Sequence, residues 1–326
     1  MKVCIYGAGA IGGFIGTRLA AAGTAEVSAV ARGATLEALR TQGWRLRQGG
    51  ASIEAPLAGA GTPSELGVQD VVVVAVKGTA LADVAERIAP LLASHTIVLP
   101  AMNGVPWWFV QGMPGVGDTP LESVDPGGRI AAGIPLPQVV GCVVHASTFT
   151  PEPGVVEHRN GTGLIIGEPS GGASARTDEL AALLKAAGFD ARASANIRHD
   201  IWYKLWGNMT MNPVSAMTGA TIDRVMADPL VLAFCTRAME EAGEIGARIG
   251  CAIEQKPEDR HKITRSLGRF KSSMQHDVEA NRPIELDALV GVVHELGQRL
   301  GVATPNVDAL LGLTRLFGRV RGLYPE

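Results

Sequence analysis

The chain has 326 residues, of which 46% are hydrophobic and 19% charged, and this composition fits two globular domains better than a disordered or coiled-coil protein. The 29 basic and 32 acidic side chains give a formal net charge of -3, which excludes a strongly basic surface for nucleic acid or an anionic membrane. No uncharged apolar run approaches the roughly 18 residues that a membrane-spanning helix needs. The cysteines and histidines show no metal-ligand spacing, so we expect no metal and a cytoplasmic location.

The chain begins with a predicted buried strand at 2–6, then a glycine-rich turn, then an apolar helix of small residues that ends near 22. The pattern G-x-G-x-x-G is weak by itself, but it is the dinucleotide-binding fingerprint when it joins a strand to a helix. Bare glycine backbone lets a pyrophosphate reach the N–H groups at the helix N-terminus. We therefore expect the turn to bind a dinucleotide through Gly7, Ala8, Gly9, Ala10, Ile11 and Gly12.

A second strand is predicted at 26–31, followed by a helix at 36–42, which completes one strand-helix-strand unit. Arg32 comes at the end of this second strand, where an NAD-specific protein usually has an acidic residue for the ribose 2′-hydroxyl. A guanidinium at this position favours the 2′-phosphate of NADP. The alternative is a solvated arginine at a strand end.

Two further strands are predicted at 70–76 and 96–99, and polar residues follow both of them. Lys77 ends the first and Asn103 follows the second, so both should lie near the nicotinamide half of the cofactor. The fold class predicted by these spacings is α/β, with an N-terminal Rossmann domain built on a doubly wound parallel sheet.

The segment 105–137 is rich in glycine and proline and predicts a long irregular excursion. Its aromatic residues Trp107, Trp108 and Phe109 suggest either a lid over the site or simple packing onto the domain. Strands at 139–149, 155–156 and 164–166 and a helix at 177–187 follow, and we expect the NADP-binding domain to span 1–195.

The remaining residues, 196–326, predict an all-α substrate and catalytic domain. Its helices are expected at 201–211, 229–249, 260–278, 286–300 and 307–321. The basic residues between 260 and 271 fit a solvated helix face better than a carboxylate site, and we assign them no role.

Three polar residues of the first of these helices, Lys204, Asn208 and Asn212, are spaced at i, i+4 and i+8. They drift only about 80° around a helix, so they line one face. A solvated stripe with a snorkelling lysine is the simpler interpretation, but two asparagines in register weaken it. Pro213 should end or kink the helix directly after Asn212.

Several of these features recur in a fixed order along the chain, together with two later ones: residues 7–12, Arg32, Lys77, Asn103-Gly104, Lys204, Asn208, Asn212, Ser272-Ser273-Met274 and Glu285. This order is typical of the ketopantoate reductase family, which the chain resembles over nearly its whole length. The resemblance implies NADPH-dependent reduction of a 2-oxo acid, 2-dehydropantoate to pantoate or a related ketoacid, and hence pantothenate biosynthesis. It also implies a Rossmann domain and a helical domain, with substrate and nicotinamide meeting in the cleft between them.

Carried over to this chain, the resemblance makes Lys204 the general acid and Glu285 a second catalytic residue in the cleft. Asn208, Asn212 and Ser273 would bind substrate. A lysine suits this role because hydride addition to a ketone develops alkoxide charge, which an ammonium stabilises and protonates. The simpler alternatives are a solvated acid near a helix start for Glu285 and plain helix surface for Ser273.

The chain departs from the family at two positions, where Phe270 and Ile222 replace the usual asparagines. Loss of two polar contacts leaves the reaction class intact but the substrate open. The alternatives are reduction of another ketone, oxidation of a secondary alcohol, or an NADP-binding regulator without turnover, against which Lys204 and Glu285 speak. A small-molecule substrate is the expected partner, and a homodimer stays open.

Overall fold

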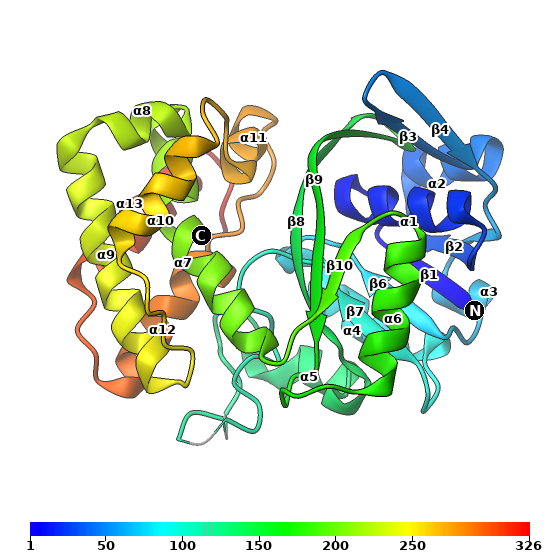
Figure 1. Cartoon of the computed structure of the whole chain (residues 1–326), viewed down its shortest axis with the longest axis horizontal. Coiled ribbons are helices and arrows are strands. Elements are labelled where there is room, and N and C mark those ends of the chain that lie inside the picture. The colour runs from blue at the N-terminus through cyan, green and yellow to red at the C-terminus, as the bar shows by residue number, and fades with distance from the viewer. Residues whose placement is uncertain (114, 118) are drawn as a thin grey trace. The chain divides into compact units, whose positions relative to one another are not determined.

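The computed structural model describes residues 1–113, 115–117 and 119–326 (Figure 1). The chain forms two compact units. The first comprises Met1–Phe109 and Gly128–Asp200, and the second comprises Val110–Gly127 and Ile201–Glu326. We expected the segment 110–127 in the first domain, whereas it packs with the second unit. The functional division at residue 195 stays a prediction.

A parallel five-stranded sheet forms the centre of the first unit, in the order β5-β2-β1-β6-β7. From β1 the chain builds outward on one side and later on the other, so the sheet is doubly wound with its switch point at the end of β1. The predicted α/β class is confirmed. The strands are β1 (Lys2–Tyr6), β2 (Glu26–Val30), β5 (Gly59–Gly61), β6 (Val71–Val74) and β7 (Ile97–Pro100).

A second sheet in the same unit has the order β10-β9-β3-β4, with β8 also paired to β9. The two short strands predicted at 155–156 and 164–166 are parts of one long strand, β9, so that prediction was wrong. Three of the other strands were not predicted at all. The bounds are β3 (Trp44–Gln48), β4 (Ala51–Ala55), β8 (Gly141–Glu152), β9 (Val155–Gly167) and β10 (Asp190–Ala193).

Helix α1 (Ala10–Ala22) contacts strands of both sheets. A Cβ on Gly13 would lie 2.5 Å from Val156 of β9, and a Cβ on Gly16 would lie 2.7 Å from the ring of Trp44 in β3. The small residues of this helix therefore allow strands of both sheets to pack closely against it. The other helices of the unit are α2 (Gly33–Gln42), α3 (Pro63–Leu66), α4 (Leu81–Arg87), α5 (Arg129–Gly133) and α6 (Ala175–Ala186).

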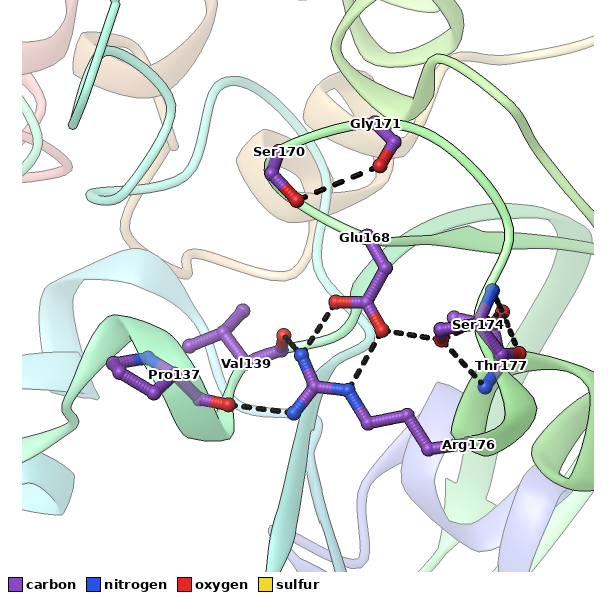
Figure 2. A network of polar contacts seen from close by, with 8 residues as sticks. All are labelled: Pro137, Val139, Glu168, Ser170, Gly171, Ser174, Arg176 and Thr177. Atoms are coloured by element: carbon purple, nitrogen blue, oxygen red, sulfur yellow. Dashed lines mark hydrogen bonds and ion pairs between the residues drawn. The ribbon is translucent and has the colours of Figure 1, made fainter.

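A polar network fixes the segment between β9 and α6 (Figure 2). Arg176 donates from Nε to Glu168 at 2.7 Å and from Nη2 to the carbonyl of Val139 at 3.2 Å. The hydroxyl of Ser174, which caps α6, donates to the same Glu168 carboxylate at 2.5 Å. The arginine hydrogen bond lowers the pKa of Glu168, so the network is built around an ionised carboxylate.

The second unit is helical, and no strand occurs among its described residues. The helix predicted at 260–278 is in fact two helices, because Gly268 adopts a φ of +71° and Ser272 caps a new start. The helices are α7 (Ile197–Thr218), α8 (Ile222–Ala227), α9 (Pro229–Arg248), α10 (Pro257–Ser266), α11 (Ser273–Glu279), a π-helical turn (Asp287–Gly291), α12 (Val292–Leu300) and α13 (Pro305–Val320).

We expected Pro213 to end or kink the helix after Asn212, and α7 does not end there but continues to Thr218. Proline removes one helical hydrogen bond, which ordinarily favours a helix end. Here the residues that follow, Val214, Ser215 and Ala216, are each at most 5% exposed. Their burial compensates for the missing bond, because tertiary packing contributes more to helix stability than local propensity does.

The three aromatic residues after Asn103 pack into the first unit, with Trp107, Trp108 and Phe109 at most 1% exposed. This burial fits the packing interpretation, and the lid stays a prediction. The segment that follows them is held by α12, where the Glu295 carboxylate accepts from the N–H of Ser123 at 2.8 Å. Among the described residues, no helix is long and apolar enough to cross a membrane.

Candidate active site

The glycine turn after β1 is shaped by contacts that only glycine permits. Gly7 has a φ of +96°, and a Cβ on it would lie 2.7 Å from Val76. A Cβ on Gly12 would lie 2.1 Å from the carbonyl oxygen of Gly7, so the helix can start directly against the turn. These two glycines fold the backbone tightly where β1 gives way to α1.

Gly9 has a different role, because no heavy atom lies within 4 Å of where its Cβ would be. It is the N-cap residue of α1, and no side chain caps this helix, whereas the Ser174 hydroxyl caps α6. The N–H groups at the start of α1 therefore have no capping side chain of the protein, and the backbone of Gly9 can be approached closely. This end of the helix fits the pyrophosphate of a dinucleotide, which the turn residues would hold through backbone N–H groups.

Arg32 caps the start of α2, just beyond the end of β2, and its side chain is 81% exposed. Its guanidinium lies 3.6 Å from Asp83, which also pairs with Arg87 at 2.8 Å. Two arginines thus share one carboxylate, leaving positive charge in excess near the strand end. Nearby, burial raises the pKa of Tyr6, and the Asp83 charge adds to this shift.

Lys77 and Asn103 follow β6 and β7, and both are half-buried. Since β1, β2, β6 and β7 are neighbours in one parallel sheet, their carboxyl ends share one edge. The structure therefore brings the glycine turn, Arg32, Lys77 and Asn103 to the same edge of the sheet, which is the edge where ligands bind in folds of this kind.

In the helical unit, the orientation of α7 is set by two tryptophans. The indole N–H of Trp202 donates to the Ala242 carbonyl at 3.2 Å, and that of Trp206 donates to the Met239 carbonyl at 2.7 Å. Both acceptors belong to α9. Each tryptophan is two residues from Lys204 in sequence, hence about 160° from it around the helix, so Lys204 points away from α9.

The face that carries Lys204 also carries Asn208 and Asn212, as the helical spacing predicts. Lys204 and Asn208 are half-buried, and Asn212 is 7% exposed. This side of α7 is therefore neither a solvated stripe nor an apolar core face. It is a partly enclosed row of polar side chains.

A serine pair connects α11 to the end of this row. The Ser215 hydroxyl donates to the Asn212 carbonyl at 3.0 Å, which leaves its oxygen to accept from the Ser272 hydroxyl at 2.6 Å. Ser272 in turn accepts from the N–H of Gln275 at 3.0 Å and so caps α11. The first residue of α11, Ser273, is exposed. Sequence reasoning missed the role of Ser272, although Ser-x-x-Gln is a capping pattern.

Glu285 is half-buried and is bracketed by residues that the end of the chain holds in place. On one side the N–H of Ile284 donates to the carbonyl of Leu323 at 3.0 Å. On the other side the Tyr324 hydroxyl donates to Asp287 at 2.6 Å, and burial raises the pKa of that aspartate. The sequence did not reveal this clamp, because its partners are distant along the chain.

The two positions where the chain departs from the family are neighbours in the structure. The N–H of Ile222 donates to the Phe270 carbonyl at 2.9 Å. Ile222 is 1% exposed and Phe270 36% exposed. The two asparagines usual in the family are therefore replaced by apolar residues at adjacent positions of the helical unit.

The chain matches known families along most of its length. Residues 3–171 match the model for ketopantoate reductase PanE/ApbA, and residues 196–317 match the model for its C-terminal part. A 2-dehydropantoate 2-reductase from Mesorhizobium japonicum is 43% identical over 99% of this chain and 100% of its own length. A crystal structure from Ralstonia solanacearum, described as a candidate ketopantoate reductase, has 54% identity, covers 99% of both chains and has a TM-score of 0.94.

These matches identify a protein with a Rossmann-type sheet and a helical unit as an oxidoreductase. The chain belongs to the ketopantoate reductase family. Its fold is also found in a D-mandelate dehydrogenase solved with NADH and anilino(oxo)acetate, with a TM-score of 0.85, 99% of this chain and 100% of the other covered, and 21% identity. At that identity the likeness concerns the fold alone.

Proposed function

We propose that this protein reduces a 2-oxo acid with NADPH and that 2-dehydropantoate, which yields pantoate, is the leading substrate. The Mesorhizobium japonicum relative, described above as a 2-dehydropantoate 2-reductase, supports the substrate. The observation that carries the proposal is the polar row on α7. Lys204, Asn208 and Asn212 share a partly enclosed face whose direction is fixed by Trp202 and Trp206.

NADPH, when bound, supplies a hydride to the ketone carbon. The chain's own residues must then bind the ketoacid and manage the negative charge that develops on the ketone oxygen. We assign the proton to the ammonium of Lys204, which stabilises this charge and then neutralises it. Amide groups of Asn208 and Asn212 and the hydroxyl of Ser273 would hold the substrate, since each can donate a hydrogen bond to its oxygens.

Glu285 would orient a substrate hydroxyl or balance the Lys204 charge. The neighbouring residues Ile284 and Asp287 are hydrogen-bonded to Leu323 and Tyr324, respectively. These bonds suit a residue that must keep its position. The glycine turn, Lys77 and Asn103 would hold the cofactor. Arg32 would select NADP, because an exposed guanidinium at the end of β2 can bind the 2′-phosphate.

A second substrate class is favoured by one observation, the adjacent apolar residues Phe270 and Ile222. A site that loses polar groups discriminates less against ketones without hydroxyl groups. Reduction of a bulkier or less hydroxylated ketoacid is therefore the second candidate. Oxidation of a secondary alcohol and NADP sensing without turnover are further outcomes of the experiment.

The experiment follows the oxidation of NADPH over a panel of 2-oxo acids that includes 2-dehydropantoate, with NADH in parallel. We expect turnover with NADPH and the highest kcat/KM for 2-dehydropantoate. A higher kcat/KM for an apolar 2-oxo acid would favour the second candidate. Cofactor binding without turnover of any ketone would support a regulator instead.

The role of Arg32 is tested by Arg32→Ala. We expect the KM for NADPH to rise about tenfold or more, because a hydrogen-bonded charge is lost, while the KM for NADH stays unchanged. An equal change for both cofactors would remove the role in 2′-phosphate recognition.

A further inference from the structure

Arg260 of α10 is a half-buried cation. Its Nε is buried and has no hydrogen-bond partner, and its guanidinium makes no ion pair with any residue that the structure describes. Asp259, the residue next to it in sequence, instead forms an ion pair with Lys262 at 2.8 Å. Of the arginines and lysines on α10, Arg260 is thus the one enclosed by neighbours and left unpaired.

The guanidinium rests against α7 beside the polar row. A Cβ on Gly207 would have three atoms of Arg260 as its nearest neighbours, with Nε at 2.5 Å, Nη2 at 2.6 Å and Cζ at 2.9 Å. The same guanidinium lies 5.2 Å from the ring centroid of Tyr203. Gly207 is three residues after Lys204 and one before Asn208, so Arg260 contacts α7 about 60° around the helix from Lys204 and about 100° from Asn208.

Burying the Nε of a guanidinium without a hydrogen-bond acceptor is unfavourable, and the contact with Tyr203 offsets only part of that cost. An arginine left in this condition binds an anion well, because its planar array of N–H groups matches a carboxylate in two parallel hydrogen bonds. A 2-oxo acid brings a carboxylate one bond away from the ketone that Lys204 would protonate. The chemistry of the ligand and the placement of the arginine therefore correspond.

We propose that Arg260 binds the carboxylate of the substrate and selects 2-oxo acids over neutral ketones. This inference rests on the proposed function, because the carboxylate arrives only with such a substrate. It revises our expectation that the whole basic run from 260 to 271 is a solvated face. This proposal also explains the glycine at position 207, since a side chain there would displace the guanidinium of Arg260.

The first experiment compares Arg260→Gln with Arg265→Gln, which removes the same charge from an exposed position of the same helix. For R260Q we expect the KM for the 2-oxo acid to rise by about tenfold to a hundredfold, as for the loss of a hydrogen-bonded charge, with little change in kcat or in the KM for NADPH. R265Q should match the wild type. An unchanged KM in R260Q would overturn the proposal.

Gly207→Ala is a second variant that keeps the charge. Only the far end of a flexible side chain has to move, so the helix should stay folded and the guanidinium should shift. We expect a rise in the KM for the 2-oxo acid that is smaller than in R260Q. A KM equal to that of the wild type, in a variant as stable as the wild type, would contradict the placement of the carboxylate.

Binding without turnover separates this inference from the proposed function. Isothermal titration with oxamate, and with its neutral counterpart oxamide, is done in the presence of saturating NADP. Wild type and R265Q should prefer oxamate, and R260Q should lose that preference. If no ketone is reduced but this pattern holds, the proposed function fails and the carboxylate site stands. If R260Q keeps the preference while 2-oxo acids are reduced, the carboxylate site fails and the function stands.

Discussion

Lys204 carries the chemistry of the proposal at the scale of single residues. It is half-buried on a helix face that two tryptophan hydrogen bonds turn away from α9. A lysine held in this way can meet the developing charge on a ketone oxygen without first reorganising, which is the condition for effective electrostatic catalysis. Asn208 and Asn212 on the same face suit binding rather than proton transfer, since an amide does not ionise.

Replacement of Lys204 by methionine should lower kcat for the 2-oxo acid by about two to four orders of magnitude, the usual range for removal of a general acid. The KM for NADPH should stay unchanged, because the residues that we propose for cofactor binding lie in the other unit. Steady-state kinetics check this, with Lys185→Met on the exposed side of α6 as the control. Full activity of K204M would show that the proton comes from elsewhere.

The row on α7 could be predicted from sequence because three polar residues at fixed helical spacing must share a face. The role of Arg260 could not be predicted, because its contact with Gly207 joins two residues that are 53 positions apart in the chain. The same is true of Tyr324 and Asp287, which meet only after the chain end has packed on the π-helical turn. The local periodicity of the sequence determines which residues share a helix face, whereas contacts with distant segments of the chain form only through tertiary packing.

At the scale of elements, the start of α11 depends on Ser272. Its hydroxyl caps the helix and connects it to Ser215 of α7. We expect Ser272→Ala to lower the free energy of unfolding by about 1 kcal/mol, the usual effect of losing a cap. Urea denaturation followed by tryptophan fluorescence measures this. Ser170→Ala, at an exposed position, serves as the control, and equal stability of S272A and S170A would contradict the capping role.

The network around Glu168 predicts a stability that depends on pH. The hydrogen bond from Arg176 holds the pKa of Glu168 below its ordinary value of 4.5. A carboxyl whose pKa is lower when folded stabilises the protein above its unfolded pKa, and this contribution is lost as the pH falls through the folded value.

Glu168→Gln should therefore lower the free energy of unfolding at pH 7, and the difference from the wild type should shrink as the pH falls below about 4. Urea denaturation at several pH values tests this, with Glu54→Gln at an exposed position of β4 as the control. A difference that is constant from pH 7 to acid conditions would mean that ionised Glu168 does not stabilise the fold.

The strands of the parallel sheet could be predicted because buried parallel strands are continuous apolar runs, as in Val71–Val74. The second sheet was missed because β3 gains its stability from β9, whose paired residues lie more than 100 positions further along the chain, as for Arg45 and Val155. The continuation of α7 beyond Pro213 was missed for a related reason. Burial of the following residues, which sequence alone does not reveal, outweighs the local effect of proline.

At the scale of the whole molecule, the two units divide the proposed reaction between them. The first carries the glycine turn at the switch point of a doubly wound sheet, and the second carries the lysine and asparagine row. The order of these features along the chain is enough to predict the family, because each belongs to a local motif. The substrate is harder to predict, since in our proposal it depends on Phe270, Ile222 and Arg260, whose contacts with other segments form only through the fold.

Transfer of label from cofactor to product tests the central claim most directly. The protein is incubated with 2-dehydropantoate and NADPH that carries deuterium at the transferable position of the nicotinamide, and the product is examined by mass spectrometry. We expect pantoate with one deuterium, bound to the carbon that was the ketone, and far less of it with K204M. Formation of pantoate without deuterium would contradict the proposed reaction. The absence of pantoate would contradict it as well, if the protein is shown to bind both NADPH and 2-dehydropantoate.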